Sequence, residues 1–124
     1  MFRFPELINR GKMKVLTRPE EQILLAAHKL ADKAYSIEIK RYLEKLTNKS
    51  WSMGAIYDPL DRLEKNGLLK SYTSEPTKER GGRSKRIYQL TRSGVDALIE
   101  IKKVTESVWK GISVETLEKK YGVK

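Results

Sequence analysis

The stretch from Ser52 to Thr91 constrains the fold more than any other part of this chain. It begins with a suitable helix N-cap, Ser52, followed by apolar residues at the spacing of one helix face: Ile56, Leu60 and Leu63. Gly67 ends this helix, because a C′ glycine readily adopts the left-handed conformation. Residues 68–75 and 85–90 are rich enough in β-forming side chains to pair as a hairpin. The stretch therefore predicts a helix followed by a β-hairpin.

The predicted hairpin has a strongly basic tip. Residues 76–84 contain the turn signal Gly81-Gly82. From Lys78 to Arg86 the single acid Glu79 is accompanied by five cations: Lys78, Arg80, Arg83, Lys85 and Arg86. A basic loop taken alone is most often a solvated loop. Next to a helix with a small, cationic outer face, we interpret it instead as a surface that lies along phosphates.

The predicted helix has an outward face that suits close approach to a flat partner. With the apolar stripe turned inward, we expect the following residues to face out near its N-terminus: Ser52, Met53, Ala55 and Pro59. Arg62 and Lys65 follow further along the same helix. Most of these side chains are small, so a flat surface can come near the helix end.

Two further helices precede this stretch. Thr17 and Glu20 form a capping box that begins the first helix, whose expected buried stripe is Ile23, Leu24, Ala27, Leu30 and Ala31. Ser36 is the expected N-cap of the second, whose expected stripe is Ile39, Leu43 and Leu46. Trp51 is interpreted as a packing anchor rather than a platform for base stacking. The only histidine, His28, is expected to be structural or exposed.

The C-terminal part predicts a long helix from Thr91 to about Gly111. Its apolar residues advance by three and four, as in a coiled-coil seam: Leu98, Ile101, Thr105, Val108 and Ile112. The first helix of the chain can cover part of this surface, and we expect a partner subunit to cover the rest. Ser113 is expected to cap a short last helix that folds back onto the dimer helices.

Composition narrows the class of protein. The chain has 124 residues, enough for one domain with a core, and a formal net charge of +10. Such a charge favours a polyanion, in the first place nucleic acid, although a membrane surface would also attract it. Zero cysteines and one histidine argue against disulfides and metal centres. No long apolar run or signal peptide is apparent, so we expect a cytoplasmic protein. The sequence shows no nucleophile–base pair, metal cluster or phosphate-cradling glycine loop, so we expect no enzymatic activity and no cofactor.

Two motifs give the chain a resemblance to a known family. Gly-x-x-Tyr-x-x-Leu-x-x-Leu-Glu-x-x-Gly-Leu falls on residues 54–68, and Tyr-x-Leu-Thr-x-x-Gly falls on residues 88–94. Together they resemble the recognition helix and the end of the wing in PadR-like transcriptional regulators, over roughly residues 16–109. The family often has proline directly after the tyrosine, where this chain has Asp58.

The resemblance implies a fold and a function. The fold is mainly α with a β-hairpin wing: an N-terminal arm (residues 1–16), a winged helix-turn-helix domain (17–91), and a long dimerisation helix with a short terminal helix (92–124). The function is a homodimeric repressor on a palindromic operator in double-stranded DNA. The alternative is a winged-helix module that binds protein or RNA.

Each predicted site residue has an expected role. Base contacts are assigned to three residues at the start of the helix that begins at Ser52: Ser52, Met53 and Ala55. Two cations further along the same helix are expected to help: Arg62 and Lys65. Phosphate contacts are assigned to Tyr35, Ser36, Tyr57, Lys78, Arg80, Arg83, Lys85 and Arg86. Trp109 is either a packing residue or the contact of a small aromatic effector.

Overall fold

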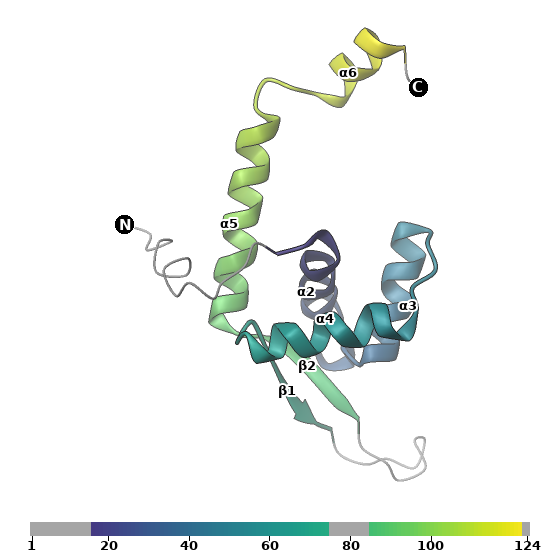
Figure 1. Ribbon diagram of the computed structural model, residues 1–124, viewed down its shortest axis with the longest axis vertical. Helices are drawn as coiled ribbons and strands as arrows, with labels where there is room; N and C mark the ends of the chain where they lie inside the picture. Colours follow the sequence, from purple (N-terminus) through teal and green to yellow (C-terminus); the bar gives the residue numbers. More distant parts are fainter. Residues whose placement is uncertain (1–15, 75–84, 123–124) are drawn as a thin grey trace.

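The structure, a computed structural model, describes residues 16–74 and 85–122 (Figure 1). Its elements follow in the order α2 (Arg18–Leu30), η1 (Ala31–Lys33), α3 (Ser36–Thr47), α4 (Met53–Lys65), β1 (Leu69–Thr73), β2 (Arg86–Leu90), α5 (Arg92–Trp109) and α6 (Val114–Tyr121). The mainly helical fold with a β-hairpin is therefore as predicted. Among the described residues, no helix has the length and apolar character needed to cross a membrane.

The helix starts follow the predicted capping residues. The Thr17 hydroxyl accepts from the Glu20 amide at 3.2 Å, and the Thr17 amide donates to the Glu20 carboxylate at 2.9 Å, which completes the capping box. Ser52, Thr91 and Ser113 each accept from a backbone amide in the first turn of α4, α5 and α6. Local hydrogen bonding therefore fixes where these four helices begin.

The start of α3 differs from the prediction by one residue. Tyr35, in extended conformation, is the N-cap, and Ser36 is already the first helical residue. Ser36 is therefore not the cap, and its hydroxyl donates to the Tyr57 hydroxyl of α4 at 3.0 Å. A contact with another helix thus replaces the predicted cap.

The hydrophobic core lies where α2, α3 and α4 meet the hairpin. Its largest fully buried side chains come from all of these elements: Ile23, Leu24, Ile39, Ile56, Leu60, Leu63, Leu68 and Leu69. Ile87 and Tyr88 close it from β2. The predicted stripe of α4 is confirmed, and it fixes which face of that helix remains free.

Three residues were placed on the wrong face. Pro59 is buried, because it lies on the same arc of α4 as Ile56 and Leu63 and its apolar ring joins their stripe. Leu46 is 63% exposed, because the last turn of α3 extends beyond the elements that cover Ile39 and Leu43. Ala31 is exposed in η1, since the α-helical period ends before it.

The hairpin is short and its register is fixed at the base. β1 and β2 are antiparallel, with Leu69 opposite Leu90 and Thr73 opposite Arg86. The Tyr88 amide donates to the Ala34 carbonyl at 3.0 Å, which ties β2 to the segment just before α3. The hairpin therefore holds a fixed position relative to α3 as well as α4.

A tight joint connects the hairpin to α5. The Thr91 hydroxyl donates to the Gly67 carbonyl at 2.6 Å, and the Thr91 amide donates to the Leu68 carbonyl at 3.2 Å. A Cβ atom added to Gly94 would overlap the carbonyl oxygen of Leu68. Only glycine allows α5 to start this close to the hairpin, which explains the glycine in the second motif.

The second half of α5 projects away from the core (Figure 1). Ala97 is buried, whereas every described residue from Lys102 onward is exposed. α6 lies beyond the end of α5 (Figure 1), and all of its residues are exposed, so within one chain it does not fold back as predicted.

Candidate nucleic-acid interface

A groove of about 610 Å³ runs between the start of α3, the free face of α4 and the start of β2. Residues that the sequence assigned separately to one interface come together here: Tyr35, Ser36, Tyr57, Lys85 and Arg86. Ile37, three acidic residues of α4 and the buried Tyr88 complete its lining: Ile37, Asp58, Asp61, Glu64 and Tyr88. Predicted contacts separated by up to 51 positions of the sequence, from Tyr35 to Arg86, therefore share one surface.

The first turn of α4 presents the small residues as predicted. Ser52, Met53 and Ala55 are exposed, and the Ser52 hydroxyl accepts from the Ala55 amide at 3.0 Å. Tyr57, one turn further, is 48% exposed, and its hydroxyl accepts a hydrogen bond from the Ser36 hydroxyl. The N-terminal end of α4 thus has few large side chains that would prevent the close approach of a duplex.

The two cations further along α4 are held by acids. Arg62 pairs with Glu20 of α2 at 3.1 Å, and Lys65 pairs with Asp61 at 3.1 Å. Glu20 is only 8% exposed and also belongs to the α2 capping box, so the Arg62 pair links the start of α2 to α4. Arg62 therefore contributes to positioning α4, while both cations remain exposed at the surface.

The start of α3 meets Lys85, the residue just before β2. The Lys85 ammonium lies 4.9 Å from the centre of the Tyr35 ring, in cation–π geometry. The Lys85 amide donates to the Ser74 hydroxyl at 3.0 Å, and its carbonyl accepts from the Ser74 amide at 2.7 Å. These contacts set Lys85 beside the N-terminus of α3, where free amides also favour an anion. Lys78, Arg80 and Arg83 lie outside the described residues.

The acidic side of the groove was not predicted. Asp61 and Glu64 were not selected from the sequence, and Asp58 was noted only as a departure from the family pattern. Glu64 accepts from the Ser71 hydroxyl at 2.7 Å and so joins α4 to β1. Asp58, Asp61 and Glu64 recur every three residues of α4 outside its apolar stripe, and this spacing is the signal that could have identified them.

Tyr88 lies in the floor of the groove. It is 6% exposed, and burial raises the pKa of its phenol above the usual value, although a hydrogen bond from Arg86 opposes this. The phenol is therefore neutral at physiological pH, so the floor adds no charge to a groove with a basic β2 side and an acidic α4 side.

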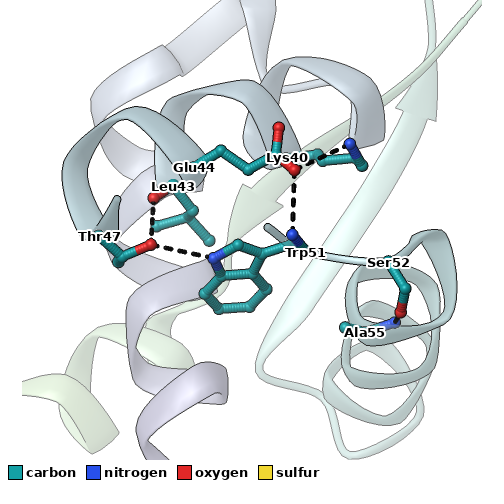
Figure 2. A network of polar contacts seen from close by, with 7 residues as sticks. All are labelled: Lys40, Leu43, Glu44, Thr47, Trp51, Ser52 and Ala55. Carbon is teal, nitrogen blue, oxygen red and sulfur yellow. Dashed lines mark hydrogen bonds and ion pairs between the residues drawn. The ribbon is translucent and has the colours of Figure 1, made fainter. Parts of the chain in front are cut away.

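A polar cluster fixes the connector between α3 and α4 (Figure 2). Glu44 accepts from the Trp51 amide at 3.0 Å and from the Lys40 ammonium at 3.0 Å. The Trp51 indole donates to the Thr47 hydroxyl at 3.1 Å, which donates to the Leu43 carbonyl at 2.7 Å. With its ring packed against the core, Trp51 anchors the start of α4.

The hydrogen bond from Trp51, together with Lys40, holds the pKa of the Glu44 carboxyl below its usual value. The ionised form of Glu44 is therefore the one that the folded connector favours.

The predicted dimer residues divide into two groups. Leu98 packs against the core of its own chain, and Ile101 is half-buried. The remaining three are exposed on the projecting part of the molecule: Thr105, Val108 and Ile112. Trp109 is 44% exposed beside them. Among the predicted seam residues, those that this chain leaves uncovered thus begin beyond Ile101, and Val95 and Ile99 of α5 are exposed as well.

Comparison with known proteins adds a family and several solved relatives. Residues 23–100 match the sequence profile of the Transcriptional regulator PadR-like family. No protein of curated function matches the chain.

Several solved structures are similar to the chain over most of its length. RosR from H. salinarum is 30% identical, with a TM-score of 0.60 over 82% of this chain and 89% of that chain. A PadR-like transcription factor from B. fragilis is 25% identical, with a TM-score of 0.63 over 88% and 94%. A PadR family transcription regulator from C. difficile is 29% identical, with a TM-score of 0.50 over 82% and 96%.

Proposed function

Because the chain belongs to the PadR-like family of transcriptional regulators, and is thus a DNA-binding regulator rather than an enzyme, we propose that it is a homodimeric repressor of a palindromic operator. The winged-helix fold of its solved relatives agrees with the architecture of α2 to β2. The proposal divides the chain as the sequence suggested, with residues 17–91 binding DNA and residues 92–124 forming the dimer. The arm of residues 1–16 has no assigned role.

One observation carries the proposed mode of binding. Residues from Tyr57 to Glu64 of α4, the start of α3 and the cations Lys85 and Arg86 border the same groove, and the first turn of α4 adjoins it at Asp58. In this arrangement the first turn of α4 enters the major groove, and Ser52, Met53 and Ala55 approach base edges. Lys85, Arg86 and the start of α3 then lie toward the phosphates on either side. Protein or RNA as the partner is the less favoured alternative, because the family is one of DNA-binding regulators.

The salt dependence of binding tests the phosphate contacts. Arg86 is exposed and lies in the groove, so Arg86→Ala should lower affinity for all duplexes alike and flatten the slope of log affinity against log salt by about 0.9 per protomer. Arg92→Ala is the matched control, because Arg92 is exposed on α5 and pairs with Asp96. An equal slope for wild type and Arg86→Ala would rule out this contact.

The exposed apolar part of α5 supports the dimer. Val108 is 69% exposed, Trp109 44% and Ile112 47%, which is a surface that a second copy would remove from water. Sedimentation equilibrium of Val108→Asp tests it, because the variant places an unpaired charge at the surface without disturbing the core. We expect monomers, whereas Ser107→Asp, on another side of α5, should remain dimeric. A Val108→Asp protein that remains dimeric at micromolar concentration would refute the proposal that this surface of α5 forms the dimer contact.

Trp109 lies on this dimer surface, and we extend the proposal to a small aromatic effector that binds beside it. Quenching of indole fluorescence by such a compound in wild type, and its loss in Trp109→Leu, would support this. Quenching that persists in Trp109→Leu would locate the compound at Trp51 and remove the effector from the dimer surface.

A further inference from the structure

The outermost row of α4 carries one carboxylate that no contact among the described residues engages. The row is Gly54, Asp58, Asp61 and Lys65, all exposed and opposite the buried stripe. Asp61 pairs with Lys65, and the neighbouring Glu64 accepts from Ser71. In the part of the chain that the structure describes, Asp58 has no such hydrogen bond or ion pair with another residue.

Asp58 also lacks a role in the stability of the helix. It is the sixth residue of α4, beyond the first turn in which an acid interacts favourably with the helix dipole. The cap of α4 is supplied by Ser52. A structural reason for an acid at this position is therefore missing from the helix itself.

The carboxylate stands above a gap in the helix surface. A Cβ atom at Gly54 would lie 4.0 Å from Asp58 Oδ2, so the carboxylate leans over a position that has no side chain. Asp58 borders the groove on the β2 side and also the hollow toward α2 that contains Trp51 and Pro19. It thus lies on the ridge between two depressions, at the part of α4 that would reach furthest into a major groove.

From this position we propose that Asp58 selects a cytosine in each half of the operator. The inference rests on the proposed function, in which α4 enters the major groove. An ionised carboxylate only accepts hydrogen bonds, and the major-groove edge of cytosine offers the N4 amino donor. Guanine offers two acceptors, thymine an acceptor and a methyl group, and adenine a donor beside an acceptor.

The same charge works against guanine and thymine at this position, because neither offers a major-groove donor, and adenine offers its one donor only beside the N7 acceptor. The DNA phosphates repel a carboxylate that enters the major groove, and this repulsion is offset only where a base amino group donates a hydrogen bond to the carboxylate. Asp58 therefore acts as a specificity residue that excludes guanine as well as one that accepts from cytosine. On the side of the first turn, Ser52, Gly54 and Ala55 are small and uncharged, so in that direction the selection falls to Asp58.

Selection of bound duplexes from random DNA tests the assignment. Wild type should enrich one cytosine at a symmetric position in each half-site. Asp58→Asn should move that position toward adenine, whose N6 and N7 match an amide, and Asp58→Ala should lose the preference. Asp61→Asn, one turn away and already ion-paired in the wild type, should keep the wild-type consensus. Unchanged melting temperatures would show that all variants fold.

A second measurement isolates the amino group. In the selected operator the cytosine is replaced by 2-pyrimidinone, which lacks the 4-amino group. Wild type should then bind roughly 5-fold to 150-fold more weakly, whereas Asp58→Ala should bind both operators equally. An equal loss in the two proteins would assign the amino group to another residue and overturn the inference.

The outcomes also separate this inference from the proposed function. A wild-type consensus that Asp58→Asn and Asp58→Ala both reproduce would overturn the role of Asp58 and leave the operator-binding proposal intact. A wild-type protein that enriches no sequence would overturn both.

Discussion

Replacing Gly94 by alanine tests the joint that fixes α5 to the hairpin. A Cβ atom at this position would meet the carbonyl oxygen and carbonyl carbon of Leu68, which are backbone atoms and cannot move aside as a flexible side chain would. The first turn of α5 must therefore shift away from the base of β1. That shift also strains the hydrogen bond from the Thr91 amide to the same Leu68 carbonyl.

The magnitude follows from three contributions. Overpacking of this kind costs about 1 to 3 kcal/mol. Loss of the Thr91–Leu68 hydrogen bond adds about 1 kcal/mol. The better helix propensity of alanine returns about 1 kcal/mol. The net expectation is a loss of about 1 to 3 kcal/mol, which for a domain of this size lowers the melting temperature by about 4 to 12 °C.

Thermal unfolding followed by circular dichroism measures this loss, and Gly54→Ala is the matched control. A Cβ atom at Gly54 would meet nothing nearer than 4.0 Å, and the residue is helical, so alanine should stabilise there by up to about 1 kcal/mol. Opposite signs for the two glycines are expected. A Gly94→Ala protein as stable as Gly54→Ala would refute the account of the joint.

Further predictions concern the core and the connector. Leu60 is fully buried, so Leu60→Ala should lower the free energy of unfolding by about 2 to 5 kcal/mol in urea denaturation, and a smaller effect would contradict its place in the core. Because the folded connector lowers the pKa of Glu44, its contribution to stability is complete above the unfolded value of about 4.3 and is lost as the pH falls through the lowered value. As the pH is lowered through this acidic range, the melting temperature of Glu44→Gln should therefore fall less steeply than that of wild type. Parallel curves of melting temperature against pH would refute the role of the carboxylate.

Local features of the fold were predictable from the sequence. The hydroxyls of Thr17, Ser52, Thr91 and Ser113 cap their helices through residues three positions away, and Gly67 is left-handed as a helix end requires. Such interactions depend only on neighbours in the chain. They therefore located the helices and the hairpin to within a few residues.

Interactions between distant residues were not predictable. The Arg62–Glu20 pair joins residues separated by 42 positions, and the Ser36–Tyr57 bond joins residues separated by 21. Both depend on how α4 packs across α2 and α3. The wrong face assigned to Pro59 has the same origin, because the width of the buried arc is set by the neighbouring elements rather than by the period of one helix.

The candidate site was predictable in its members but not in its balance of charge. Tyr35, Tyr57 and Arg86 were each selected from local patterns, and the structure brings them to one groove. The acids on the opposite wall were not selected, because a sequence shows the net charge of a segment and not which charges face each other across a groove.

If the first turn of α4 reads the DNA bases, Ala55→Glu should lose its affinity for the selected operator. Ala55 is exposed, so the variant should melt like wild type but lose operator affinity by orders of magnitude. Gln89→Glu changes the net charge equally at an exposed position of β2 that borders a different depression, and it should bind within about threefold of wild type. Operator binding by Ala55→Glu that equals that of Gln89→Glu would show that the first turn of α4 does not read the bases.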